Sequence, residues 1–404
     1  MQTDRYGLQL ATASAAAAAA YQEGIDRILS AWPGADTYLQ RALDEDPGFA
    51  LAHAAMGRLH QMYARMPQAR GCIEKARALA ASATPRERAH VEILGHAIEG
   101  RPPRALEALL PHLEEWPRDA FAFSLALGAF GLYAFGGRAD HDAARLALCE
   151  RHARHYGNDD WWFLTYLGWS NTEAGRLAEG ETHTARSLEL RADNAHGAHA
   201  MAHWYAEAQD LAGGAAFLER WQPRYTPEGM LWGHVSWHST LAWLEANEPA
   251  RALACVRERL LPEVNLGPPI NRISDAASLL WRIGLREPVD AALWAPLRRY
   301  VDSQFPGPAP HFIEWHVALV LAATHDEPAA EKRLADIRSR EASGVLPTGG
   351  TLEAVCRGIA AYGRGDRREA AAQLSRSRPD WPRLGGSGAQ RRLLAETLKA
   401  VSPA

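Results

Sequence analysis

Large ring side chains recur at a fixed interval in the middle of this chain. Trp169, His203 and Trp237 stand 34 residues apart, and each follows a small residue, which is glycine, alanine or serine in turn. An interval of 34 residues is that of the tetratricopeptide helix-turn-helix unit. The pattern therefore predicts antiparallel helical hairpins stacked one after another.

Turn signals fall where such units require them. Gly175, in the sequence Glu-Ala-Gly-Arg, lies where the first helix of a hairpin would turn into the second, and an Asp-Pro turn at 46–47 separates two helical stretches. Residues 362–366 and 368–373 repeat the order of turn and second helix. We therefore predict an all-α superhelix of degenerate tetratricopeptide-like hairpins that closes around a central pocket. It would be one domain over residues 1–404, with residues 160–320 forming the pocket.

The composition favours helical structure and argues against nucleic acid as a partner. The chain has 404 residues, of which 47% are hydrophobic, so it can bury a sizeable core. Alanine is abundant whereas valine, isoleucine and threonine are sparse, a bias typical of helices. The formal net charge is -4 and lysine is rare, so the chain lacks the basic surface that binding of nucleic acid requires.

The cysteines and the one long apolar run indicate a cytoplasmic protein. Cys72, Cys149, Cys255 and Cys356 are scattered without a Cys-x-x-Cys spacing, which is typical of reduced thiols. The apolar run Ala11–Ala20 is too short to cross a bilayer and has no basic segment before it. We expect it to form a helix, neither a signal peptide nor an anchor, and we expect no membrane partner.

Two histidine pairs carry the strongest chemical signal. His199 and His203, like His234 and His238, are four residues apart, so each pair projects from one face of its helix. Adding 34 to the first pair gives 233 and 237, which places the two pairs side by side on the inner wall. Converging imidazoles from separate elements suit a divalent metal, with zinc favoured.

Other polar residues are expected to face the same cavity. Asp275 lies 38 residues beyond Trp237 in a helical stretch, 273–281, and His316 lies on the next inner helix. Glu207 stands four residues after His203 and extends the face of that pair. Asp275 or Glu207 would serve as a metal ligand or as a general base.

Each of these residues has a purely structural alternative. The imidazoles of His199 and His203 would also suit hydrogen bonds to carbonyl groups in a helix interface, and His316 would also fill a core. Asp275 would also accept a hydrogen bond from a buried Trp or His N–H group, and Glu207 would also meet solvent or Arg220. His196 is interpreted as a residue at the beginning of a helix and not as a ligand.

Tryptophans gather around the same region, and familiar catalytic motifs do not occur in the sequence. Most of the tryptophans should pack in the core, but a few near the histidines would give an aromatic-walled pocket that suits a small organic ligand. No phosphate-binding loop, Gly-x-Ser-x-Gly elbow or His-Glu-x-x-His motif is present. Ser236 and Ser239 lie beside the histidines, but nothing in the sequence activates them. Ser387, in a Gly-rich segment, is a candidate N-cap.

Several blocks resemble the tetratricopeptide repeat protein 38-like proteins, nearly from end to end of the chain. The blocks are Asp4-Arg-Tyr-Gly7, Asp46-Pro-Gly-Phe49, Pro85-Arg-Glu-Arg-Ala-His90, Trp116-Pro-Arg-Asp-Ala120, His199-Ala-Met-Ala-His203, His234-Val-Ser-Trp-His238, Asp275-Ala-Ala-Ser-Leu-Leu-Trp-Arg282 and Gly385-Gly-Ser-Gly-Ala-Gln-Arg391. The resemblance implies the helical-repeat fold and the pocket but no defined reaction. It also adds Gln390 and Arg391 as candidate substrate-binding residues.

The chain departs from that family pattern near the candidate site. Gly388 stands where the family has a histidine, Arg392 stands where it has an aspartate, and Ala206 stands where it has an acidic residue, with Glu207 one position later. These departures leave open whether an inherited pocket is still active.

Two hypotheses about function follow. The first is an enzyme, a metal-dependent hydrolase or lyase acting on a small organic molecule, with a metal-free variant in which the histidines act as acid and base. Its catalytic residues would be His199, His203, His238, Asp275 and Glu207. Its substrate-binding residues would be Trp237, His316, Gln390 and Arg391, and its metal ligands would be His199, His203, His234 and His238.

The second hypothesis is a non-catalytic scaffold that binds a peptide or protein in its concave groove. Such grooves usually present Lys, Arg and Asn on their inner helices, whereas this chain has His and Trp there. The pattern therefore favours the small-molecule pocket, and it leaves open a homo-oligomer.

Overall fold

Antiparallel helical hairpins make up nearly all of the computed structural model, which describes residues 2–402. The chain begins with a two-stranded antiparallel sheet, β1 (Gln2–Thr3) and β2 (Gln9–Leu10), in which Gln2 pairs with Leu10. The N-terminal helices are α1 (Ala15–Leu29), α2 (Ala35–Glu45), α3 (Ala50–Met62), α4 (Met66–Ala80), α5 (Pro85–Ile98), α6 (Pro102–Glu115), α7 (Ala120–Ser124), the 3-10 helix η1 (Ala134–Gly136), α8 (His141–His152) and η2 (Ala153–His155).

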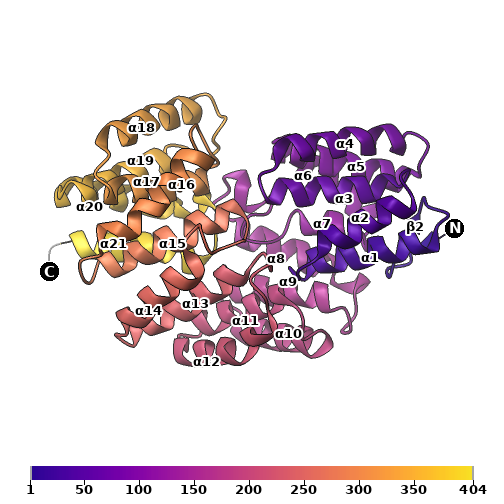
Figure 1. Ribbon diagram of the computed structural model, residues 1–404, viewed down its shortest axis with the longest axis horizontal. Coiled ribbons are helices and arrows are strands. Elements are labelled where there is room, and N and C mark those ends of the chain that lie inside the picture. The colour runs from indigo at the N-terminus through magenta and orange to yellow at the C-terminus, as the bar shows by residue number, and fades with distance from the viewer. Residues whose placement is uncertain (1, 403–404) are drawn as a thin grey trace.

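The central and C-terminal helices continue the array (Figure 1). The central ones are α9 (Trp161–Glu173), α10 (Leu177–Leu190), α11 (Ala195–Glu207), α12 (Leu211–Trp221), η3 (Gln222–Arg224), α13 (Trp232–Glu245), α14 (Pro249–Cys255) and the π-helix η4 (Val256–Leu260). The C-terminal ones are α15 (Pro269–Gly284), η5 (Ala291–Leu293), α16 (Trp294–Gln304), α17 (His311–Ala323), α18 (Glu327–Ala342), α19 (Thr351–Gly363), α20 (Arg367–Ser377), η6 (Arg378–Leu384) and α21 (Gly388–Val401).

The all-α prediction and the predicted turns are confirmed. The Asp46-Pro47 turn separates α2 from α3, and Gly175 lies between α9 and α10 with a φ of +80°. A left-handed backbone favours glycine because glycine has no Cβ to clash. The turn at 362–366 likewise ends α19 before α20. Of the apolar run 11–20, for which the sequence predicts a helix, residues 15–20 form the first turns of α1 and residues 11–14 precede the helix. The N-cap Ser14 accepts a hydrogen bond from the amide of Ala17.

The small residue that precedes each large ring has a packing role in the best-defined hairpin. Gly168 lies on α9 where α10 crosses it, and a Cβ at this position would overlap the hydroxyl of Thr184 and lie 2.8 Å from the Thr184 backbone nitrogen. Gly180 of α10 faces Thr172 of α9 in the same way. The repeat pattern in the sequence therefore reflects close backbone contact between paired helices.

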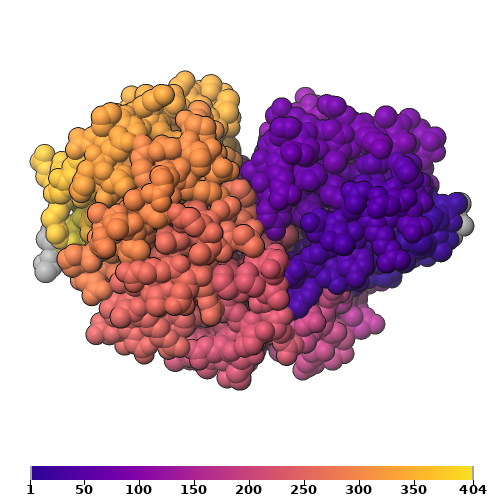
Figure 2. Space-filling view, in the orientation of Figure 1, coloured from indigo at the N-terminus to yellow at the C-terminus, as the bar shows by residue number. Residues whose placement is uncertain are grey.

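The C-terminal helices return to the middle of the chain and bring distant segments together. Helix α21 contacts α11 and α15, and the amide of Gly386 donates to the carbonyl of Ala129 at 3.2 Å. Arg383 donates to the carbonyl of Gly137 at 2.9 Å. Figure 2 shows the N-terminal hairpins and the C-terminal hairpins as two lobes separated by a furrow.

Buried apolar side chains form two main clusters that meet at α13. The first runs from Tyr6 to Val235, and the second runs from Trp237 to Leu394. Helix α13 supplies Val235 to one cluster and Trp237 to the other, so the histidines beside these residues lie between the two cores. In residues 2–402, no helix combines the length and the apolar character that a bilayer crossing requires.

Candidate metal centre

Two neighbouring inner helices carry the histidine pairs. Helix α11 bears His199 and His203, and α13, which packs against it, bears His234 and His238. The N-cap of α11 is Asn194, whose side-chain oxygen accepts from the Gly197 amide while its amide group donates to Thr165 of α9 at 2.9 Å. Capping thus sets both the start of α11 and its register on the preceding hairpin.

The four imidazoles converge on one point. The Nε2 atom of His199 lies 3.0 Å from Nε2 of His203 and 3.0 Å from Nε2 of His234. One ring nitrogen from each of the four histidines lies within 4.8 Å of the others. Zinc bonds to histidine of 2.0–2.1 Å imply nitrogen separations of about 3.3–3.4 Å in a tetrahedral site, so small ring movements would complete one.

A carboxylate backs one histidine of each pair. Nδ1 of His203 lies 2.9 Å from Oε1 of Glu173, and Nδ1 of His234 lies 2.8 Å from Oδ1 of Asp275. The second oxygen of Glu173 accepts a hydrogen bond from the amide of Gly388 at 2.9 Å. The Asp275 contact is a hydrogen bond, whereas the Glu173 contact is a charge contact without hydrogen-bond alignment. A carboxylate in this position favours the ring proton on Nδ1 and leaves the lone pair of Nε2 free for a metal, the usual outer shell of a metal-binding histidine.

This arrangement leaves too few protons between the ring nitrogens. With their protons on Nδ1, His203 and His234 both present lone pairs to Nε2 of His199, which carries at most one hydrogen and can satisfy only one of them. Nε2 of His238 is also buried and has no hydrogen-bond partner among residues 2–402. The donor set therefore fits a cation better than it fits a closed hydrogen-bond network.

Burial and nearby charges oppose extra protons on His199 and His238. Burial, followed by the charge of neighbouring histidines, lowers the pKa of His199 and of His238 well below the ordinary value. Burial raises the pKa of Glu173, but the close contact with His203 and its charge outweigh burial, so that carboxyl has a lowered pKa and stays ionised. Neutral imidazoles backed by ionised carboxylates are the protonation states that metal binding requires.

Aromatic rings enclose the cluster. Trp237 stacks on His234 with ring centroids 5.4 Å apart and planes 8° apart, and it meets His238 edge to face at 4.9 Å. The indole N–H of Trp237 donates to Ser278 at 3.0 Å. His203 is fully buried, whereas His199 is partly exposed. Approach from solvent is therefore on the His199 side.

The structure brings Glu207 close to the cluster and pairs it with Arg392. The two side chains form an ion pair, and burial raises the pKa of Glu207 despite the opposing charge of Arg392. A Cβ at Gly388 would lie 3.2 Å from Glu207 and 3.6 Å from Glu173. The C-terminal segment therefore closes over the carboxylates that surround the histidines.

Three other predicted residues lie outside the ring of nitrogen atoms. Nδ1 of His316 contacts the carbonyl of Phe312 at 2.8 Å, and burial lowers the pKa of His316 to about 3. Gln390 forms a capping box with Ser387, which confirms the predicted N-cap of α21. Arg391 contacts Asp142 at 3.1 Å and the carbonyl of Gly385 at 3.3 Å. Each of the three already has a protein partner.

Glu173 is a site residue that the sequence reasoning missed. It stands at the end of α9 and 34 residues before Glu207, so the repeat interval already relates the two positions. Applying that interval backwards from Glu207 would have found it. The sequence gives no sign, however, that Glu173 meets His203 while Glu207 meets an arginine from α21.

A second cluster of potential metal ligands surrounds Asp119, and there the positive charge is the side chain of Arg86. Asp119 lies 2.9 Å from His90, 3.0 Å from His112 and 3.0 Å from Nη1 of Arg86. All four side chains are buried. The guanidinium group neutralises the carboxylate, so this cluster is a structural network that ties the N-terminal hairpins together.

Comparison with known proteins does not identify a family or a function for this chain. No family model matches the chain. A chain of the solved Naa15/Naa10 complex bound to HypK-THB aligns with 90% of this chain and 63% of its own length, at 11% identity and a TM-score of 0.23. The present chain thus spans less than two thirds of that protein. The tetratricopeptide-like superhelix is instead defined by the helical hairpins themselves.

Proposed function

We propose that His199, His203, His234 and His238 bind one divalent transition-metal ion. The observation that carries the proposal is the convergence of ring nitrogens that lack enough protons to satisfy one another. Four neutral imidazoles suit zinc, copper, iron or nickel, and a tetrahedral all-nitrogen set favours zinc. Glu173 and Asp275 would orient the rings from behind.

The chemistry of this centre supports a metal-dependent enzyme, a hydrolase or lyase that acts on a small organic molecule. A catalytic ion needs one coordination position open to water or substrate, so three of the four histidines would hold it during turnover. Held by neutral ligands, such an ion keeps its full charge, and when bound it supplies a Lewis acid that polarises a carbonyl group or lowers the pKa of water. Glu207, with its raised pKa, is the candidate general base, and the indole of Trp237 would limit access of water.

Three further proposals concern the family of the protein, its location in the cell and its partner. We propose membership of the tetratricopeptide repeat protein 38-like proteins on the blocks quoted above, with Gly388 and Arg392 as departures beside the site. We also propose a cytoplasmic location, because the four cysteines are free thiols and three of them are buried. The partner would be a small molecule.

Metal analysis of the purified protein tests the proposal. Protein prepared without chelators and without an affinity nickel column should contain about one metal ion per chain by mass spectrometry. A His199→Ala/His203→Ala variant should lose the ion while circular dichroism shows an unchanged helical content. His196→Asn is the matched control, since His196 lies on α11 one turn before His199 and outside the cluster.

The outcomes separate the hypotheses. Loss of metal in the double variant and its retention in the control would support the centre and justify a screen of hydrolytic and lyase reactions. A folded wild-type protein that takes up no zinc, copper, iron or nickel would contradict the metal proposal. Two hypotheses would then remain: a metal-free pocket in which the histidines act as acid and base, and a scaffold whose concave surface binds a peptide or protein.

A further inference from the structure

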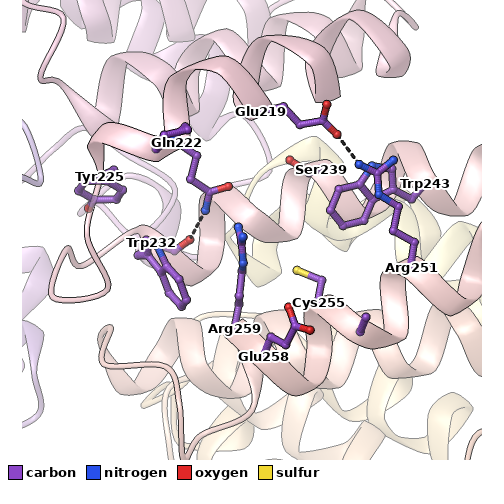
Figure 3. Close-up of a pocket in the computed structure, with 12 residues that line it drawn as sticks. Glu219, Gln222, Tyr225, Trp232, Ser239, Trp243, Arg251, Cys255, Glu258 and Arg259 are labelled. Carbon is purple, nitrogen blue, oxygen red and sulfur yellow. Dashed lines mark hydrogen bonds and ion pairs between the residues drawn. The ribbon is translucent and has the colours of Figure 1, made fainter.

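A cavity opens beside α13, on the part of the helix that faces away from the histidines. Figure 3 shows the residues that line it. The cavity has a volume of about 490 Å³ and lies among α12, α13, α14 and η4. That volume is in the range of small-molecule sites. Trp232, Ser239 and Trp243 of α13 line it, and on a helix with 3.6 residues per turn these positions point on average about 140° away from His234 and His238.

The floor of the cavity is buried and neutral. Ser239 is 3% exposed and Cys255 is 5% exposed. Burial raises the pKa of the Cys255 thiol to about 12, so this group is not a thiolate at neutral pH. The walls include the indoles of Trp232 and Trp243. A flat, largely apolar ring matches such a surface.

The walls also hold an unused hydrogen-bond donor. The indole N–H of Trp243 is buried and has no partner among residues 2–402. The nitrogen has almost no accessible surface, and the indoles of Trp162, Trp169 and Trp315 are unpaired in the same way, so Trp243 contributes the face of its ring to the cavity.

Two arginines stand at the mouth of the cavity, and they differ in what they bind. Arg251 is neutralised, because it contacts Glu219 at 2.5 Å and Glu248 at 3.4 Å while lying over the ring of Trp243. Arg259 has no ion pair among residues 2–402, and its one side-chain hydrogen bond is a 3.5 Å contact to Ser236. Arg259 therefore keeps its donors free for an anion.

Arg259 owes its position to an irregular helix. Residues Val256–Leu260 form a π-helix that continues α14, and π-helical turns are frequently found at functional sites. Here the turn places the guanidinium over the ring of Trp232, with its carbon atom 5.5 Å from the ring centroid. Glu258, on the same turn, is exposed, so solvent screens its charge.

We propose that this cavity binds a small aromatic carboxylate, with the ring between the tryptophans and the carboxylate on Arg259. Arginine binds a carboxylate through paired N–H donors, and indole faces favour flat rings. The site is separate from the metal centre, so its occupancy does not depend on bound metal.

Titration of the full chain with defined probes tests this site. Benzoate, 4-hydroxybenzoate and indole-3-acetate serve as aromatic carboxylates, and benzamide and indole serve as uncharged controls, with binding followed by calorimetry and saturation-transfer NMR. At least one carboxylate should bind saturably and at least about tenfold more tightly than its uncharged control, the size of one charge-assisted contact. Arg259→Gln should remove that difference, whereas Arg251→Gln should retain it.

Further variants separate this site from the metal centre. Ala254→Phe, which fills the cavity from its wall, should abolish binding of charged and uncharged probes alike in a folded protein. The His199→Ala/His203→Ala variant should bind the carboxylates as the wild type does, whether or not it binds metal. The proposal is overturned if no carboxylate binds, if charged and uncharged probes bind equally, or if Arg259→Gln leaves binding unchanged.

Discussion

Removing the charge of Asp275 should weaken metal binding without disturbing the fold. Asp275 is 1% exposed and lies 2.8 Å from Nδ1 of His234, and Asp275→Asn keeps its size and an acceptor oxygen while losing the negative charge. A carboxylate behind a metal-binding histidine is worth about 10- to 100-fold in affinity, which corresponds to about 1.4–2.7 kcal/mol. Glu173→Gln should have an effect of the same size on the His203 side.

Competition with a chromophoric zinc chelator measures this change. The thermal unfolding temperature, with and without metal, provides a second readout, because a ligand that binds only the folded state stabilises it in proportion to the logarithm of its affinity. Asp275→Asn should lose metal-dependent stabilisation and change the metal-free protein little. Glu396→Gln is the control. Glu396 pairs with Arg282, which lies on α15 as Asp275 does, but among residues 2–402 Glu396 pairs with no histidine.

The reasoning would be refuted by zinc affinity that is equal in wild-type, Asp275→Asn and Glu173→Gln proteins. It would also be refuted if both substitutions lowered the unfolding temperature equally with and without metal. In that case the carboxylates would only satisfy buried imidazole N–H groups.

Three further substitutions test stability. Asp119→Asn should lower the free energy of unfolding by about 3–5 kcal/mol, because it leaves a buried arginine without its counter-charge; denaturant titration measures this. Burial raises the pKa of Asp119, but its histidine and arginine neighbours outweigh burial and hold that pKa well below the ordinary value. The wild type should therefore lose this stabilisation as pH falls below about 4. Asp119→Asn, which has no carboxylate to protonate here, should show a flatter dependence of stability on acid pH. Gly168→Ala should destabilise the protein by about 1–3 kcal/mol, because its Cβ overlaps Thr184, and a neutral result would contradict the close packing of α9 on α10. Gly71→Ala, on a helix with open space around it, should instead be stabilising by about 0.5–1 kcal/mol.

Much of the fold was predictable because its signals are local. The 34-residue interval, Gly175 and the Asp46-Pro47 turn depend on short stretches of chain, and the structure confirms the hairpins they predicted. Half of the candidate centre was predictable for the same reason. A spacing of four places His199 beside His203 on one helix wherever that helix lies, and the repeat interval then brings His234 and His238 next to them.

The rest of the candidate centre depends on contacts between distant segments. Glu173 reaches His203 because α9 packs against α11, and its other oxygen binds Gly388, which lies 215 residues further along the chain. His316 has the right residue type and lies on an inner helix, yet it contacts its own helix at Phe312. Helical register alone therefore does not decide whether a histidine on an inner helix contacts the candidate centre or its own helix.

The sequence by itself determined the helices, their turns and the pairing of the four histidines, because each follows from spacings within one or two repeats. Only the tertiary structure decided which carboxylates lie behind the histidines, that Arg392 pairs with Glu207, and that a cavity lies beside α13 away from the histidines. Each hairpin is rotated slightly relative to the one before it, and these rotations accumulate along the superhelix. Their sum determines which distant helices α21 contacts, and therefore which side chains meet at the candidate centre.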